Sequence, residues 1–93
     1  MGNVISKEKL EKYFSLTERG LVEVRENVFK GKDSEAEEII EMVSNYVSDA
    51  HHFEENGDVV NAFAALNYAH GWLDCGVRLE VFDVSDRDLF TVR

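Results

Sequence analysis

Residues 58–79 read DVVNAFAALNYAHGWLDCGVRL, and their pattern of apolar residues indicates the fold class. Its apolar residues recur at intervals of three and four positions, which is the period of an amphipathic α-helix. Asp58 can cap the first turn, because a carboxylate is favoured by the free backbone N–H groups there. We therefore predict a helix over 59–82. Its core-facing seam consists of Val59, Phe63, Leu66, His70, Leu73 and Val77.

Two further helices are predicted before this one. The first spans 7–29, with Ser6 as N-cap and Gly31 in the left-handed conformation beyond its C-terminus. The second spans 35–55, and Ser34 with Glu37 forms the pattern of a capping box at its start. The seams of these helices have the same spacing, and they consist of Leu10, Phe14, Thr17, Leu21, Val24 and Val28, and of Ile39, Val43, Tyr46, Ala50 and Phe53.

Three matched seams in 93 residues predict an all-α fold with one shared core. The connections are short, so consecutive helices must run antiparallel. We expect a single domain over 1–93, built as an up-down-up three-helix bundle with left-handed, coiled-coil-like packing and a short C-terminal tail over 83–93. A long helical hairpin completed by a second chain is the alternative. The turn between Ala50 and Ala62 also resembles a tetratricopeptide hairpin, but no second copy follows.

The composition argues against several classes of partner. Nineteen Asp and Glu against ten Lys and Arg give a net charge of −9, which repels nucleic acid and anionic membranes. The longest stretch without Asp, Glu, Lys or Arg, 59–73, is too short to span a bilayer. Cys75 is the single cysteine and cannot form an internal disulfide, which fits a reducing compartment. We therefore expect a cytoplasmic protein that binds neither nucleic acid nor membrane.

Carboxylates of the second helix are the first candidates for chemistry. Glu37, Glu38 and Glu41, followed by Glu55 and Asp58, resemble the acidic motifs with which all-α nucleotide pyrophosphohydrolases hold Mg²⁺. At ~100° per residue, the first three point ~120° or more away from the centre of the core-facing seam. We interpret them as solvated charges, helped by the positive end of the helix.

The histidines and the cysteine are the remaining candidates. His51 and His52 are adjacent and diverge by ~100°, so one ion cannot bind both; His51 with Glu55 is a weaker possibility for a surface metal. His70 lies on the core-facing seam and needs a hydrogen-bond partner, which Asp74 one turn later can supply. We interpret this pair as buried and structural, and Cys75 as a small apolar residue.

No enzyme, catalytic residue, cofactor or metal site is therefore predicted. The alternative is a metal- or nucleotide-dependent enzyme that uses the outward-facing glutamates or His70 and Asp74.

The predicted third helix carries a second apolar stripe, ~160 to 240° from the middle of its seam. A terminal helix of an isolated bundle needs one apolar face, and exposed Trp and Tyr are typical of interfaces. We therefore favour a protein-interaction or assembly module, and expect a homo-oligomer. A different protein, or the chain's own tail through Leu89, Phe90 and Val92, could also cover the stripe. The stripe consists of Ala64, Tyr68, Trp72, Cys75, Leu79 and Phe82.

Several segments of the sequence carry a resemblance to a known family. They are Tyr13-Phe14, Thr17, Leu21, Ser48-Asp49-Ala50, Phe53, Gly57-Asp58, Val60-Asn61-Ala62-Phe63-Ala64-Ala65-Leu66, Tyr68-Ala69-His70-Gly71-Trp72-Leu73-Asp74 and Gly76-Val77-Arg78-Leu79. Together they resemble the archaeal domain-of-unknown-function family 357 over roughly residues 10 to 84. The resemblance implies a small three-helix bundle in an archaeal cytosol. It implies no activity, ligand or catalytic residue.

Overall fold

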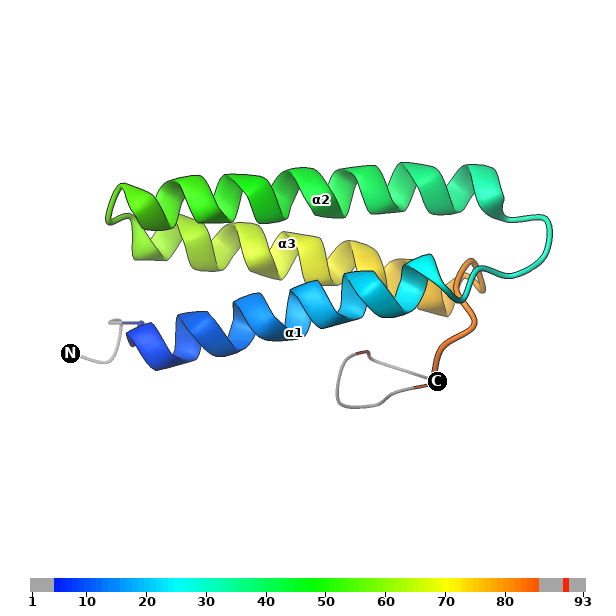
Figure 1. The fold of residues 1–93 in the computed structure, drawn as a ribbon, viewed down its shortest axis with the longest axis horizontal. Helices are drawn as coiled ribbons and strands as arrows, with labels where there is room; N and C mark the ends of the chain where they lie inside the picture. Colours follow the sequence, from blue (N-terminus) through cyan, green and yellow to red (C-terminus); the bar gives the residue numbers. More distant parts are fainter. Residues whose placement is uncertain (1–4, 86–89, 91–93) are drawn as a thin grey trace.

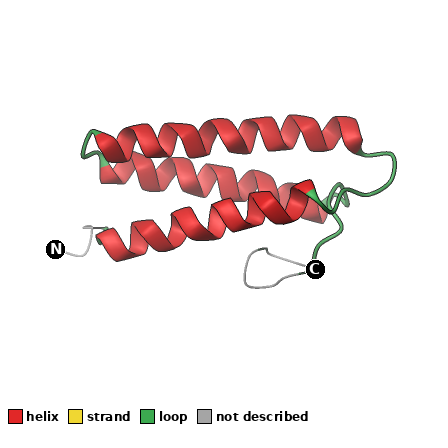
Figure 2. Ribbon diagram, viewed as in Figure 1, coloured by secondary structure: helices red, strands yellow, loops and turns green. Residues whose placement is uncertain are grey.

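The computed structural model of the protein describes residues 5–85 and Phe90. Its helices are α1 (Lys7–Arg25), α2 (Asp33–Glu55) and α3 (Val59–Arg78). In Figure 1, α1 and α3 run in one direction and α2 runs in the other. The predicted up-down-up three-helix bundle is therefore confirmed. Figure 2 shows helices joined by loops, without a strand in the described residues.

Side-chain caps begin two of the three helices. Ser6 Oγ accepts a backbone N–H of the first turn of α1 at 3.1 Å. Asp58 Oδ1 does the same for α3, also at 3.1 Å, so both predicted caps are confirmed. The capping box predicted at Ser34 and Glu37 is wrong, because α2 already begins at Asp33 and Ser34 lies inside the first turn. Carboxylates in that turn still interact favourably with the positive end of the helix dipole.

The first helix ends four residues earlier than predicted, at Arg25. At this end the Glu23 carbonyl accepts the backbone N–H of Glu26 at 3.3 Å and the side-chain amide of Asn27 at 2.8 Å, so it does not need a helical partner four residues later. Gly31 does adopt a positive φ of 85°, as predicted. It lies in the loop between α1 and α2, however, rather than directly after the helix.

The third helix also ends four residues earlier than predicted, at Arg78. A Schellman motif closes it: the Val81 N–H donates to the Gly76 carbonyl at 2.9 Å, and Glu80 adopts a positive φ of 60°. This reversal turns the following residues back onto the bundle. Phe82 is consequently only 1% exposed and packs against Gly76, so its predicted place on the outward stripe is corrected.

Small residues bring α2 and α3 close together. Buried alanines occur on both helices and a buried glycine occurs on α3, and such small residues let two backbones approach. These residues are Ala36 and Ala50 on α2, and Ala62, Ala65, Ala69 and Gly76 on α3. Helix α1 lies against this pair, and it diverges from α2 toward its own N-terminus (Figure 1).

The core-facing side of α3 is rotated from the predicted seam. Leu66, Leu73 and Val77 are buried as expected, but Val59, Phe63 and His70 are only half-buried. The small residues take the centre of the contact instead, because α2 approaches on their side. None of the helices in the described part of the chain combines the length and the apolar character that a membrane span requires.

Candidate functional site

The candidate site is the outer face of α3, the side of the helix that points away from α1 and α2. At ~100° per residue, its positions lie opposite the buried ones such as Ala69 and Leu73. We define this outer face as Val60, Ala64, Asn67, Tyr68, Gly71, Trp72, Cys75, Arg78 and Leu79; Ala64 is half-buried and the others are exposed. It extends the predicted stripe along the whole helix, without Phe82.

Large apolar side chains gather on the outer face. Tyr68 and Leu79 are each 65% exposed, and Trp72 is 38% exposed. Five large hydrophobic residues are exposed in the described part of the chain, and four of them, these three and Val60, belong to this face. Scattered exposed apolar residues are ordinary, whereas a contiguous group marks an interaction surface.

The outer face contains a shallow depression next to an ordered aromatic ring. Asn67, Tyr68, Gly71, Trp72 and Cys75 line a shallow depression with a volume of about 330 Å³. The Tyr68 ring is held by stacking on Tyr46 of α2, with the ring centroids 5.7 Å apart and the planes inclined by 20°. Such a pre-positioned ring loses little conformational freedom when a partner covers it.

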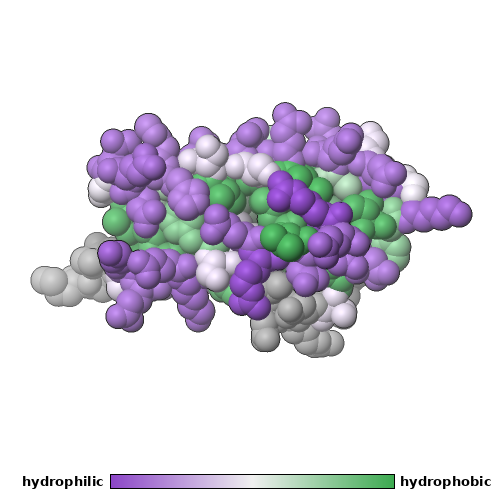
Figure 3. Space-filling view, viewed as in Figure 1, coloured by the Kyte–Doolittle hydropathy of each residue, from purple (hydrophilic) through white to green (hydrophobic). Residues whose placement is uncertain are grey.

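Charge is nearly absent from this side of the molecule. Nine of the eleven exposed residues of α1 are charged, and seven of the twelve exposed residues of α2 are acidic. On α3 only Arg78, one of eight exposed residues, is charged. Figure 3 shows hydrophilic side chains over α1 and α2, with apolar groups between them. The outer face of α3 is therefore the surface that costs least to remove from water.

The tail, as far as the structure describes it, lies on a different side of α3. Phe90 is buried, its ring is stacked 6.5 Å from the ring of His70, and it lies close to Gly20 of α1. It occupies the junction of α1 and α3 and not the outer face. Leu89 and Val92, the other residues of the predicted covering tail, lie outside the described residues.

His70 and Asp74 lie together one helical turn apart. Their Nε2 and Oδ1 atoms are 3.9 Å apart, which is an ion-pair distance when the imidazole is protonated and too long for a hydrogen bond. Both side chains are about one quarter exposed, so the pair is less buried than the sequence suggests. With Tyr13, Leu16, Asn67 and Gly71, they line a small cavity of about 220 Å³ at the junction of α1 and α3, so Asn67 and Gly71 border both this cavity and the depression on the outer face.

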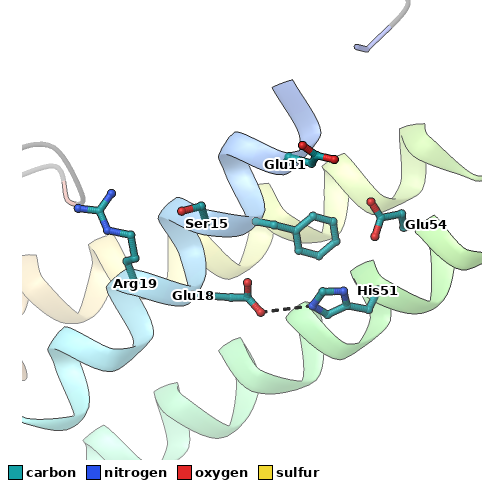
Figure 4. Close-up of a pocket in the computed structure, with 7 residues that line it drawn as sticks. Glu11, Ser15, Glu18, Arg19, His51 and Glu54 are labelled. Carbon is teal, nitrogen blue, oxygen red and sulfur yellow. Dashed lines mark hydrogen bonds and ion pairs between the residues drawn. The ribbon is translucent and has the colours of Figure 1, made fainter. Parts of the chain in front are cut away.

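A second depression, of about 460 Å³, lies between α1 and α2 (Figure 4). His51 Nε2 lies 3.3 Å from Glu18 Oε2, and the imidazole stacks on the Phe14 ring with centroids 4.3 Å apart. Glu11 and Glu54 line the depression from α1 and α2 (Figure 4). Sequence reasoning missed this contact, because Glu18 and His51 are separated by 33 residues and no local pattern connects them.

The carboxylates considered for metal binding stay apart from these histidines. Glu37, Glu38 and Glu41 are exposed on α2, and Asp58 is engaged as the cap of α3. His51 pairs with Glu18 of α1 rather than with Glu55. Across residues 5–85 and Phe90, no group of three or more His, Cys, Asp or Glu side chains could hold a metal ion.

Comparison with known proteins identifies a matching family. Residues 12–82 match the model of a family described as "Protein of unknown function (DUF357)". The matched region contains most of α1, all of α2 and α3, and the chain reversal up to Phe82. No curated protein and no solved structure matches the chain.

Proposed function

This chain belongs to the DUF357 family of proteins of unknown function, and from its own surface we propose that it is a protein-interaction module whose binding surface is the outer face of α3. The observation that carries this proposal is the concentration of exposed Tyr68, Trp72 and Leu79 on one face of α3 and its C-cap, in a molecule whose other helices expose mostly charged and polar residues. Aromatic rings bury a large area with few rotatable bonds, so they anchor interfaces.

The chemistry of the outer face defines what kind of partner fits it. Because Arg78 is its single charge, a partner does not have to compensate several desolvated ions. The depression beside Tyr68 and Trp72 is shallow and apolar, and it suits side chains of a packed surface better than a polar metabolite. The expected partner is therefore a protein that presents an apolar, uncharged surface.

Site-specific photo-crosslinking in the source cell tests this proposal. A photoreactive phenylalanine analogue replaces Tyr68, whose ring is exposed; in the matched control it replaces Glu37, which is exposed on α2. Irradiation should produce a covalent adduct of higher mass from position 68 and none from position 37. No adduct at position 68, or equal adducts at both positions, would show that the outer face is not a binding surface.

A further inference from the structure

Gly71 is unlike the other described glycines. Gly31 and Gly57 have positive φ angles of 85° and 75°, which glycine adopts without strain. At Gly20 and Gly76, a Cβ would lie 3.1 Å and 2.5 Å from neighbouring side-chain atoms. Gly71 has an ordinary helical φ, and a Cβ there would meet nothing within 4 Å. Nothing inside the described bundle therefore requires a glycine at position 71, although glycine weakens a helix interior.

The position of Gly71 suggests what the missing side chain allows. On a helical wheel, residue 71 lies opposite the centre of the buried side, at the middle of the outer face. A helix without a side chain at this point can be approached by another backbone at the short end of helix–helix distances, roughly 8 Å. A close neighbour at this point would give Gly71 the role that Gly76 has beside Phe82, where the missing side chain leaves room for the neighbour.

We propose that this neighbour is α3 of a second copy of the chain, packed antiparallel across Gly71 about a two-fold axis. The proposal rests on the proposed function and names its partner. Two copies that each carry a net charge of −9 repel one another over the acidic surface of α2. The outer face is where they can meet without placing carboxylates opposite carboxylates. A two-fold contact also pairs a surface with itself, so the point of closest approach lies near the axis.

The one charge on the outer face selects the antiparallel direction. Arg78 lies seven residues beyond Gly71, or about 10 Å along the helix. In an antiparallel pair centred on Gly71, the two Arg78 residues are therefore about 20 Å apart along the helix axis, whereas a parallel pair would place them side by side. The same symmetry leaves Tyr68 and Trp72 of both copies on one side of the contact, next to the two α2 helices. Their rings can then form a shared aromatic cluster.

The expected dimer is weak. A 20-residue helix is about 30 Å long, so one helix face supplies an interface at the small end of the known range. We expect a dissociation constant in the micromolar range.

The mass of the purified chain, measured by sedimentation equilibrium between roughly 1 and 100 µM, tests the proposal. Wild type should pass from monomer to dimer. Gly71→Leu adds a good helix former in open space, so the bundle should stay folded while the dissociation constant rises at least ~10-fold. Asn45→Leu, at an exposed position of α2, adds the same side chain elsewhere and should leave the constant unchanged. Tighter association of Gly71→Leu would indicate unspecific hydrophobic contact and overturn the proposal.

Disulfide trapping tests the geometry. In a Cys75→Ser background, Gly71→Cys should form a covalent dimer on mild oxidation, because the two copies of residue 71 meet at the axis. Val60→Cys, exposed on the same face, should not, since its two copies lie about 33 Å apart in the antiparallel pair. Trapping through residue 60 but not through residue 71 would overturn the antiparallel arrangement. A monomer at every concentration would overturn the dimer, while an adduct of Tyr68 to a different protein would still support the proposed function.

Discussion

The two sides of α3 are both apolar, yet they are built differently. On the inner side, side-chain size is matched to a neighbour: Gly76 accommodates Phe82, and Leu73 is fully buried against Gly20. On the outer side, a Cβ added at Gly71 would lie within 4 Å of no neighbour in the described part of the chain, and Leu79 remains largely exposed. Apolarity alone therefore does not separate residues that stabilise a fold from residues that recognise a partner. The two kinds of residue differ in whether neighbouring side chains fill the space around them.

Leucine-to-alanine substitutions should give the largest difference in stability between the two sides of α3. Leu73→Ala opens a cavity at a fully buried position and should lower the free energy of unfolding by about 2–5 kcal/mol. Leu79→Ala removes the same atoms from a side chain that is 65% exposed, and should change this free energy by less than about 0.5 kcal/mol.

Urea denaturation of both leucine variants below the dimer's dissociation constant, followed by circular dichroism, measures this difference. Low concentration keeps any dimer from contributing to the stability of the chain. A loss at Leu79 as large as the loss at Leu73 would mean that the outer side is part of the folded core.

Glycine-to-alanine substitutions should give a smaller difference in stability between the two sides of α3, and the changes should have opposite signs. In Gly76→Ala the new methyl group would lie 2.5 Å from Phe82 Cε2 and 3.1 Å from Ile39 Cδ1, so neighbours must shift; we expect a loss of about 1–3 kcal/mol. In Gly71→Ala the methyl group enters open space and helix propensity improves, so the monomer should gain about 1 kcal/mol. Thermal unfolding of the two variants at low concentration measures both changes. Destabilisation of the monomer by Gly71→Ala would show an unrecognised contact at that position.

Sequence periodicity predicts the topology and many of the inner-side residues, although the buried side of α3 is rotated toward its alanines. The spacing of Leu10, Phe14, Leu66 and Leu73 places all four in the core, and the caps at Ser6 and Asp58 were readable because a cap depends on residues three positions apart. The C-terminus of α2 at Glu55 is confirmed, whereas the predicted helices for α1 and α3 extend too far. Their apolar residues continue in register after the backbone has left the helix.

Other features depend on tertiary contacts that a periodic pattern does not contain. Phe82 fits the outward stripe as a helical residue, but the reversal after Arg78 buries it. Thr17 was expected on the seam and is fully buried, yet its hydroxyl has no hydrogen-bond partner among the described residues. The open space beside Gly71 is also visible only in the structure, because the sequence alone does not show which glycines have close neighbours.

The smallest expected effect lies at the junction of the two sides, where Leu79 points outward and Val81 turns inward. Glu80 between them adopts a φ of 60°, a left-handed conformation that favours glycine over residues with a Cβ. Glu80→Gly and Glu80→Ala lose the same carboxylate and its interactions, so their difference isolates the backbone. We expect the glycine variant to be more stable than the alanine variant by about 1 kcal/mol, or roughly 4–8 °C in Tm for a domain of this size. Equal stability would indicate that the chain leaves α3 without the Schellman motif. Phe82 would then be free to lie on the outer face, and the distinction between the two sides of α3 would lose its structural basis.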